Sequence, residues 1–229
     1  MTEQRIKVSI IVPCYNEEST IQLLLEAILK QDFPLDNLEV IIADSLSQDN
    51  TVRRIREFVK NHPQLNLKIV ENPKRTIPAA INAAAAVAQG EYLVRLDAHS
   101  IPYPDYISLC IQDLEAGKGQ NVGGVWKIKA GAENAIAKAI AVATAHPLGV
   151  GDALYRYSQK AAEVDTVPFG SFRRNLFFQL GGFDESLRTN EDYEFNTRIR
   201  KMGGKIWLDP QVRCIYFSRK NLKELAAQY

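Results

Sequence analysis

Short apolar runs recur along the first hundred residues, and each is followed by a polar turn and then by a helical pattern. These runs have the length and composition of buried strands, and they cover residues 8–12, 38–43, 67–70 and 92–96. Alternating strands and helices are typical of βαβ units, whose right-handed crossovers build a parallel sheet covered on both faces. We therefore predict an α/β fold with a Rossmann-like, mainly parallel central sheet.

The segments between the strands have one-sided apolar patterns. In the first, the apolar residues that share a face are Ile21, Leu24, Leu25, Ile28 and Leu29. We expect Asn16 to cap this helix, with Glu17 and Glu18 in its first turn. A second helix repeats the pattern at Val52, Ile55, Phe58 and Val59, with Asp49 or Asn50 as its cap. A third, over residues 79–88, is mostly alanine, so it can lie close against the sheet.

After residue 96 the alternation loosens, and the second half has an α+β character. We expect an Ala-rich helix near residues 132–145, a Gly/Pro-punctuated stretch over 146–151, and helices over 192–202 and from 221 to the end. The chain has no internal repeat, linker-like segment or low-complexity run. We therefore predict a single domain, residues 1–229, with halves that meet near residue 100.

The charge balance and the cysteines narrow the classes of partner and the cellular setting that we expect. The chain has 28 Lys and Arg against 27 Asp and Glu, so it lacks the basic excess that supports nucleic-acid binding. Three widely spaced cysteines without a CxxC pair argue against a disulfide framework and a structural zinc site, and favour a reducing, cytoplasmic setting. The first apolar run is too short for a signal peptide or a membrane span, so we expect a soluble chain.

Two predicted strands end in residues suited to a ligand. In open α/β sheets, ligands bind beyond the carboxyl ends of the strands. Pro13, Tyr15 and Glu17 follow the first strand, although a capped helix start explains the carboxylate equally well. Asp44 follows the second strand and is not needed as a cap. Its carboxylate can accept hydrogen bonds from a base N–H or from ribose hydroxyls.

A third strand ends in Asp97-Ala98-His99. On an extended segment, residues two apart face the same side, so Asp97 and His99 can reach one ion. A carboxylate oxygen with an imidazole nitrogen suits Mn²⁺ or a similar divalent cation, which could neutralise a leaving diphosphate. The alternative is a turn aspartate beside a surface histidine.

Two further groups of polar residues lie near the C-terminal end. Gly181-Gly182-Phe183-Asp184-Glu185 has the composition of a loop, and the acids Glu191, Asp192 and Glu194 lie at a predicted helix start. Acids there suit the helix dipole. The functional alternative is that crowding raises the pKa of one of them, which then acts as a general base on an acceptor hydroxyl.

Taken together, these motifs resemble family 2 glycosyltransferases of the GT-A fold. The resemblance runs from about residue 6 to the C-terminus and rests on the motifs' joint occurrence, order and rough spacing. It is closest to bacterial succinoglycan-type exopolysaccharide glucosyltransferases, through Arg95 with the Asp-Ala-His motif and through Glu163-Val164-Asp165-Thr166-Val167 with Gly170 and Arg173.

The resemblance implies a role for each group of residues. The half over about 1–100 would bind the nucleotide of a nucleoside-diphosphate sugar, through Pro13, Tyr15, Glu17, Asp44, Arg75, Arg95 and Asp97. Lys74 could also serve the phosphates, or could be solvated. His99, with Asp97, would hold Mn²⁺ or Mg²⁺. In the half over about 101–229, Asp192 would be the base, with Glu191 or Glu194 as alternatives, and the acceptor end would be shaped by Gly181, Gly182, Phe183 and Asp184.

The expected activity is inverting, metal-dependent transfer of a sugar, with UDP as the family's commonest nucleotide, to a glycan or lipid-linked acceptor in cell-surface or exopolysaccharide synthesis. The usual Asp-x-Asp is Asp97-x-His99 here. Relatives often continue into membrane helices, so we expect a C-terminal membrane region beyond residue 229 and a place at the inner face of the plasma membrane. A nucleotide-sugar-binding pseudoenzyme is the alternative function. A dehydrogenase is disfavoured because no GxGxxG follows the first strand.

Overall fold

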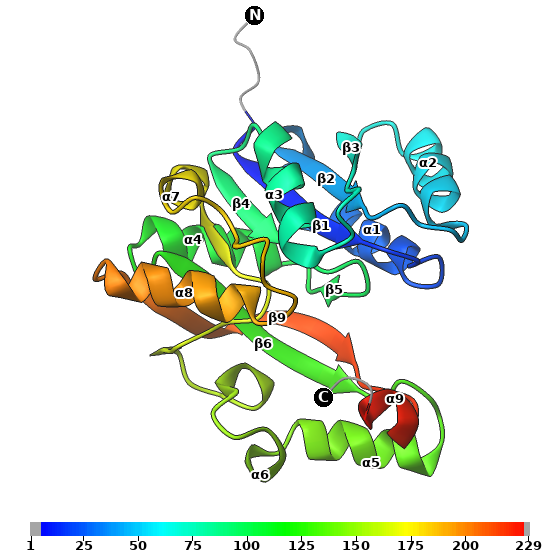
Figure 1. Cartoon of the computed structure of the whole chain (residues 1–229), viewed down its shortest axis with the longest axis vertical. Helices are drawn as coiled ribbons and strands as arrows, with labels where there is room; N and C mark the ends of the chain where they lie inside the picture. Colours follow the sequence, from blue (N-terminus) through cyan, green and yellow to red (C-terminus); the bar gives the residue numbers. More distant parts are fainter. Residues whose placement is uncertain (1–5, 227–229) are drawn as a thin grey trace, which may run out of the picture.

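The computed structural model describes residues 6–226, and the four predicted strands are all present (Figure 1). They are β1 (Val8–Cys14), β2 (Leu38–Asp44), β3 (Leu67–Glu71) and β4 (Tyr92–Arg95). They pair in parallel in the order β3-β2-β1-β4. β2 and β3 therefore lie on one side of β1, and β4 lies on its other side. The sheet order reverses at that point, beside the carboxyl end of β1.

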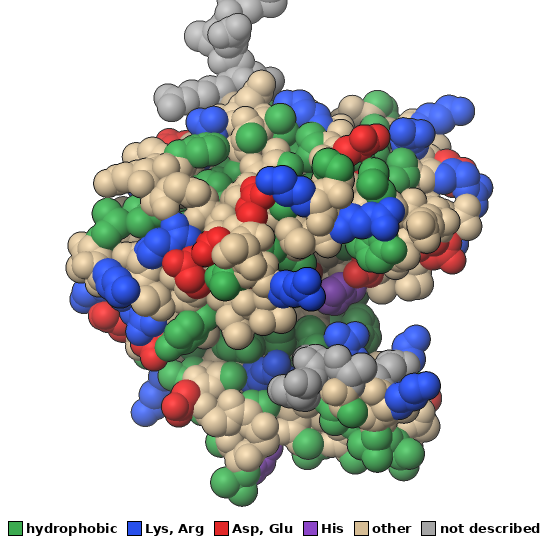
Figure 2. Space-filling view, in the orientation of Figure 1, with side chains coloured by type: hydrophobic (Ala, Val, Ile, Leu, Met, Phe, Trp, Pro, Cys, Tyr) green, Lys and Arg blue, Asp and Glu red, His purple; other side chains and the backbone are tan. Residues whose placement is uncertain are grey.

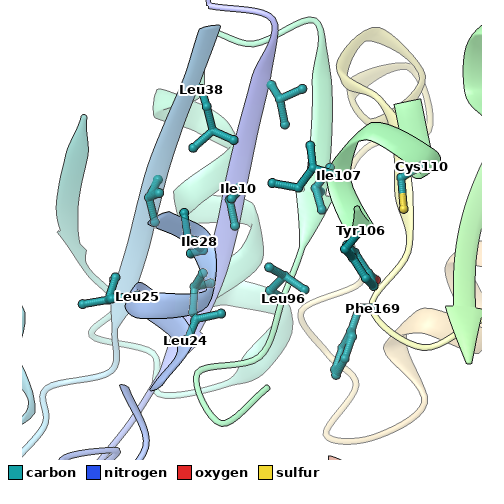
Figure 3. Close-up of a cluster of buried hydrophobic side chains, with 14 of the residues drawn as sticks. Ile10, Leu24, Leu25, Ile28, Leu38, Leu96, Tyr106, Ile107, Cys110 and Phe169 are labelled. Atoms are coloured by element: carbon teal, nitrogen blue, oxygen red, sulfur yellow. The ribbon is translucent and has the colours of Figure 1, made fainter. Parts of the chain in front are cut away.

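Helices cover both faces of this parallel region. They are α1 (Ile21–Leu29), α2 (Thr51–Asn61), α3 (Ile77–Val87) and α4 (Tyr106–Glu115). Neighbouring β1 side chains point to opposite faces, so Ile10 packs with α1, α2 and α4, whereas Ile11 packs with the alanines of α3. Figure 3 shows the first of these clusters, where side chains of α1 lie against Ile10 and Leu38. These packed faces fix the strand ends where polar residues follow.

The second half continues the same sheet with mixed pairing. Its strands are β5 (Ile101–Pro102), β6 (Asn121–Lys129), β7 (Ala162–Glu163), β8 (Ser171–Arg173) and β9 (Ile206–Phe217). β8 joins the two halves through antiparallel pairs with β4 and β6, while β6 and β9 run parallel. α7 (Arg174–Gln179) and α8 (Glu191–Lys201) pack by aromatic residues onto the same face as α3. One continuous sheet therefore connects the predicted halves.

Strands β6 and β9 extend into a lobe below the rest of the sheet (Figure 1). The lobe carries α5 (Ala135–Thr144), α6 (Pro147–Val150), the 3₁₀ turn η2 (Leu154–Arg156) and α9 (Leu222–Ala226); a further 3₁₀ turn, η1 (Leu35–Asn37), precedes β2. The predicted C-terminal helix corresponds to α9, and the last three residues of that prediction lie outside the described part. Within residues 6–226, no helix is both long and apolar enough to cross a bilayer.

The predicted cap of the first helix is wrong. α1 begins at Ile21 after Thr20, and Asn16 lies in the left-handed region with φ of 54°. The N–H groups of Glu17 and Glu18 donate instead to Thr51 Oγ1 at 2.7 Å and Asp49 Oδ2 at 3.2 Å. These bonds hold residues 16–18 as a turn ahead of the helix. Of the two caps predicted for α2, Asn50 holds the N-cap position, without a side-chain cap bond. Asp49 precedes it, and its Oδ1 accepts from Thr51 N at 2.9 Å.

Candidate active site

A cleft of about 390 Å³ lies at the carboxyl ends of β1, β2 and β4, where the sheet order reverses. Ligands in α/β sheets bind at such points. Its lining includes six of the predicted donor or metal residues: Pro13, Tyr15, Glu17, Arg75, Asp97 and His99. Arg75, Thr76 and Ile77 close it from the loop before α3, and Cys14, Ser45 and Ala98 complete it. Four separate segments of the sequence, residues 13–17, 45, 75–77 and 97–99, therefore meet at one place.

The Asp97-Ala98-His99 motif lies in a turn and not on the extended segment that the sequence analysis assumed. Ser100 N donates to Asp97 O at 2.9 Å, which closes the turn. His99 Nδ1 lies 2.9 Å from Glu17 Oε1. Since an ionised carboxylate only accepts, Nδ1 carries the proton in this contact, and the Nε2 lone pair of a neutral His99 stays available. The bond to Glu17, helped by the charge of Asp97, raises the pKa of His99.

Arg95 connects this turn to α8. Its side chain is 6% exposed, and it donates to Asp97 Oδ1 at 3.3 Å and to Glu191 Oε1 at 3.1 Å. A buried charge is tolerated when it is paired in this way, and removal of one partner costs about 3–5 kcal/mol. Burial opposes the charge, but Asp97 and Glu191 outweigh it and raise the pKa of Arg95. The sequence predicted Arg95 as a ligand of the donor, but its side chain does not line the cleft. It instead connects Asp97 at the cleft to Glu191 at the start of α8.

The three acids at the start of α8 have different surroundings. Glu191 is buried and paired with Arg95, and Glu194 pairs with Arg198 at 2.7 Å. Asp192 is half-buried and accepts from the N–H of Tyr193 at 2.8 Å, and its charge contributes to the raised pKa of Arg95. Of the three, Asp192 is the carboxylate without an ion-pair partner among the contacts of residues 6–226. Its carboxylate could therefore accept a proton without the loss of an ion pair.

Two predicted donor residues have other contacts. Asp44 is 5% exposed, and its carboxylate accepts from Ser47 N at 3.0 Å and Ser47 Oγ at 2.5 Å. The cleft lining includes the next residue, Ser45, in its place. Lys74 forms an ion pair with Glu185, so it is engaged with another loop and not simply solvated.

The Gly181–Asp184 segment forms a tight loop that fastens α3 to α8. Asn82 of α3 accepts from Phe183 N and donates to Phe183 O, both at 2.9 Å. Arg198 of α8 donates to Gly182 O at 2.8 Å. Phe183 is buried among the rings of Phe177 and Phe195. None of the four residues lines the described hollows, so the geometry gives them a supporting place.

A second hollow, of about 730 Å³, lies between η2, β7 and α8. Two tyrosines, three carboxylates and one guanidinium line it: Tyr155, Tyr193, Asp152, Glu163, Asp165 and Arg200. Arg200 pairs with Asp165 and lies 5.5 Å from the Tyr193 ring, and Lys205 pairs with Glu163 at 3.3 Å. Tyr193 directly follows Asp192, so this hollow begins beside the candidate base.

The residues present fit a divalent cation that shares its coordination with a ligand. Asp97 supplies carboxylate oxygen and His99 an imidazole nitrogen, both at the cleft. Within residues 6–226, no three His, Cys, Asp or Glu side chains gather as a metal-binding group. Mg²⁺ and similar ions are commonly held by one or two protein ligands with substrate phosphates and water. The donor set suits an ion that arrives with a diphosphate.

The cysteines are free, as the sequence predicted, and all three are buried. Burial raises the pKa of Cys14 far above its ordinary value and that of Cys110 and Cys214 to about 12, so none is a reactive thiolate. Two features of the site are not among the predicted ones: the bonds of Asn82 to the loop at Phe183, and the internal ion pairs of Arg95. A single arginine inside the apolar run 92–96 was the available signal, because a charge on a buried strand needs partners.

Comparisons with known proteins show the family of the chain. The sequence model of the family described as "Glycosyl transferase family 2" matches residues 9–181. The succinoglycan biosynthesis protein ExoA of Rhizobium meliloti is 33% identical over 96% of this chain and 66% of its own length. A Methanococcus voltae protein is 31% identical over 96% of this chain and 70% of its own length. It is named dolichyl N-acetyl-alpha-D-glucosaminyl phosphate 3-beta-D-2,3-diacetamido-2,3-dideoxy-beta-D-glucuronosyltransferase.

Solved structures confirm the predicted GT-A fold. A mannosyltransferase of Pyrobaculum calidifontis, solved with GDP-Man and Mn²⁺, superposes with a TM-score of 0.75 at 28% identity, over 98% of this chain. The TarS protein of S. aureus, solved with UDP, superposes with a TM-score of 0.72 at 23% identity, over 92% of this chain. In both cases the chain spans 60% of the solved protein. Its length thus corresponds to only part of these relatives.

Proposed function

The chain belongs to glycosyl transferase family 2, and from that premise we propose that it transfers a sugar from a nucleoside-diphosphate donor to a hydroxyl of a glycan or lipid-linked acceptor, with inversion. The single observation that carries the proposal is the Arg95 bridge. One buried guanidinium contacts Asp97 of the cleft and Glu191, the neighbour of Asp192. It holds the donor cleft and the candidate base in register.

The donor would occupy the cleft at the ends of β1, β2 and β4. Tyr15 is 46% exposed and offers a ring face for a base to stack on, while Ser45 and the loop before α3 supply polar groups. Asp97 and His99 would hold a divalent cation that supplies positive charge to the leaving diphosphate. Relatives solved with UDP or with GDP-Man and Mn²⁺ support a nucleotide donor of this class.

Asp192 would act as the base. Its carboxylate takes the proton of the acceptor hydroxyl while that oxygen forms a bond to the anomeric carbon, and the bond from that carbon to the diphosphate oxygen breaks. A single displacement from the opposite face inverts the anomeric configuration. Glu191 cannot take this role without the loss of its ion pair to buried Arg95.

The acceptor would enter by the second hollow. Tyrosine faces with carboxylates are the groups that bind the apolar and hydroxyl sides of a neutral sugar. The name of the Methanococcus voltae relative describes an acceptor with a dolichyl-linked N-acetylglucosaminyl phosphate. We therefore propose an acceptor whose sugar part lies near Tyr155 and Tyr193.

The test is nucleotide release from UDP-glucose, UDP-N-acetylglucosamine and GDP-mannose, with Mn²⁺ and a polyprenyl-linked N-acetylglucosaminyl phosphate as acceptor. Loss of a general base typically lowers turnover by about 10²–10⁴-fold, so Asp192→Asn should do so while it still binds the nucleotide. Glu194→Gln is the matched control on the same helix, and its turnover should stay near wild type. Near wild-type transfer by Asp192→Asn would reject the assignment of the base. Donor binding with no turnover of any donor would favour the pseudoenzyme.

A further inference from the structure

Helix α5 presents apolar side chains on two sides. Ala137 and Ile140 are buried against the lobe. Ile136, at the edge of that buried side, is 51% exposed, and Val142, on the outer side, is 69% exposed. A helix that is apolar all round is normally covered on every side. No segment of residues 6–226 covers this outer side, which leaves it to a partner.

The apolar surface continues from α5 onto α6. Val142 and Leu148 line one shallow hollow between the two helices, and Leu148 is 94% exposed. Gly149 keeps the helices close, because a Cβ there would lie 2.3 Å from Ala143 O. Leu222 of α9 is a further exposed apolar residue, at 63%, in the same lobe (Figure 1). We call Ile136, Val142, Leu148 and Leu222 the lobe tip.

The lobe tip is set among basic residues. Segments 127–160 and 217–226 contain eight Lys or Arg and three Asp or Glu, although the whole chain has a net charge of only +1. Lys138 lies on α5 beside the hollow, and Lys223 lies on α9. Figure 2 shows apolar and basic side chains together on this lobe, below the body of the molecule. Exposed apolar residues among basic ones are typical of surfaces that bind anionic membranes.

We propose that the lobe tip docks the protein on an anionic lipid surface. Apolar side chains of α5 and α6 enter the headgroup region, and the surrounding lysines bind lipid phosphates. The lobe's own residues form this surface, so the proposed docking does not depend on a membrane-spanning helix. This proposal rests on the proposed function in one respect only: a lipid-linked acceptor would lie at the same membrane surface.

The experiment is co-sedimentation of the chain with vesicles of phosphatidylcholine and phosphatidylglycerol, against vesicles of phosphatidylcholine alone. The wild type should bind the anionic vesicles, and added salt should weaken the binding. We expect Val142→Asp with Leu148→Asp to lower the partition coefficient at least about tenfold, since both apolar insertion and charge attraction are lost. Lys138→Glu with Lys223→Glu should lower it by a similar factor.

Matched controls carry the same changes on other helices. Val87→Asp at the end of α3 and Lys60→Glu on α2 alter exposed residues far from the lobe, and each should bind vesicles as the wild type does. Circular dichroism and calorimetric binding of UDP and GDP check that each variant is folded. Vesicle binding that survives without nucleotide binding would reject the proposed function alone.

Three results would overturn the proposal. They are a wild type that does not bind anionic vesicles, lobe variants that bind them as well as the controls, and a change of oligomeric mass in the lobe variants. The last result, measured by analytical ultracentrifugation, would assign the lobe tip to contact with a second copy.

Discussion

His99 is the residue whose charge the site controls most directly. The tautomer of its ring is fixed, because Nδ1 lies 2.9 Å from Glu17 Oε1 and carries the proton in that contact. The charge of Asp97 also acts on the ring. Both carboxylates favour the protonated ring, whereas a metal ligand must be neutral. Protons and a divalent cation therefore compete for His99.

We predict that Glu17→Gln lowers the pKa of His99, measured by NMR titration of the ring protons. The folded pKa lies above the ordinary 6.5, so this pair stabilises the fold below pH 6.5, and the contribution is lost as pH rises through the folded pKa. The same reasoning predicts that Mn²⁺ affinity of the wild type rises with pH over that range, and less steeply in the variant. Signals of His62 and His146 serve as internal controls. An unchanged His99 titration would contradict the contact with Glu17.

At the scale of elements, the loop between α7 and α8 ties α3 to the helix that carries the candidate base. Asn82 of α3 holds Phe183 by two bonds, and Arg198 of α8 holds the carbonyl of Gly182. Gly182 has φ of 73°, and a Cβ there would lie 2.7 Å from Asn82 Oδ1. The loop therefore depends on glycine for both conformation and space.

We predict that Gly182→Ala lowers the free energy of unfolding by more than Gly181→Ala does. Both glycines have positive φ, so both substitutions incur backbone strain of about 1–3 kcal/mol. No atom lies within 4 Å of a Cβ at Gly181, so only Gly182→Ala must also displace Asn82. Urea unfolding of the two variants measures the difference. Equal losses would mean that Asn82 does not constrain the loop.

Element by element, the sequence predicted best where packing repeats a local pattern. The apolar runs of β1 to β4 and the one-sided helices α1 to α3 were predictable because burial on one or both faces dictates the residue types. β5, β7 and β8 have two or three residues each, and long-range pairing alone makes them strands. The turn at residues 97–100 was misread for a similar reason, since a hydrogen bond and not a hydrophobic pattern forms it.

Side-chain partners were harder to predict than positions. Pro13, Tyr15, Asp97 and His99 meet at the cleft because strand ends of one parallel sheet must lie together. The inward turn of Arg95 toward Glu191 joins residues 96 positions apart, and no local pattern encodes such a pair. Asp44 differs, because its partner Ser47 is only three positions away, in the turn that follows β2.

For the whole molecule, one continuous sheet connects a nucleotide-type cleft to a lobe with an exposed apolar tip. β6 and β9 run from beside β8, which pairs with β4, out to α5 and α9. The proposed donor position is the first of these ends, and the lobe tip is the second. An enzyme that moves a soluble sugar to a lipid-linked acceptor needs both ends in one rigid frame.

The most direct test of this account is calorimetric binding of UDP, GDP and dTDP, each with and without Mn²⁺, to the wild type and to His99→Ala. We expect one nucleotide to bind in a Mn²⁺-dependent manner and the variant to lose at least about tenfold in affinity, as is typical when a metal's ligand shell is impaired. No binding of any nucleotide to a folded wild type would contradict the central claim. Equal nucleotide binding by the wild type and His99→Ala would contradict the assignment of a metal to this cleft.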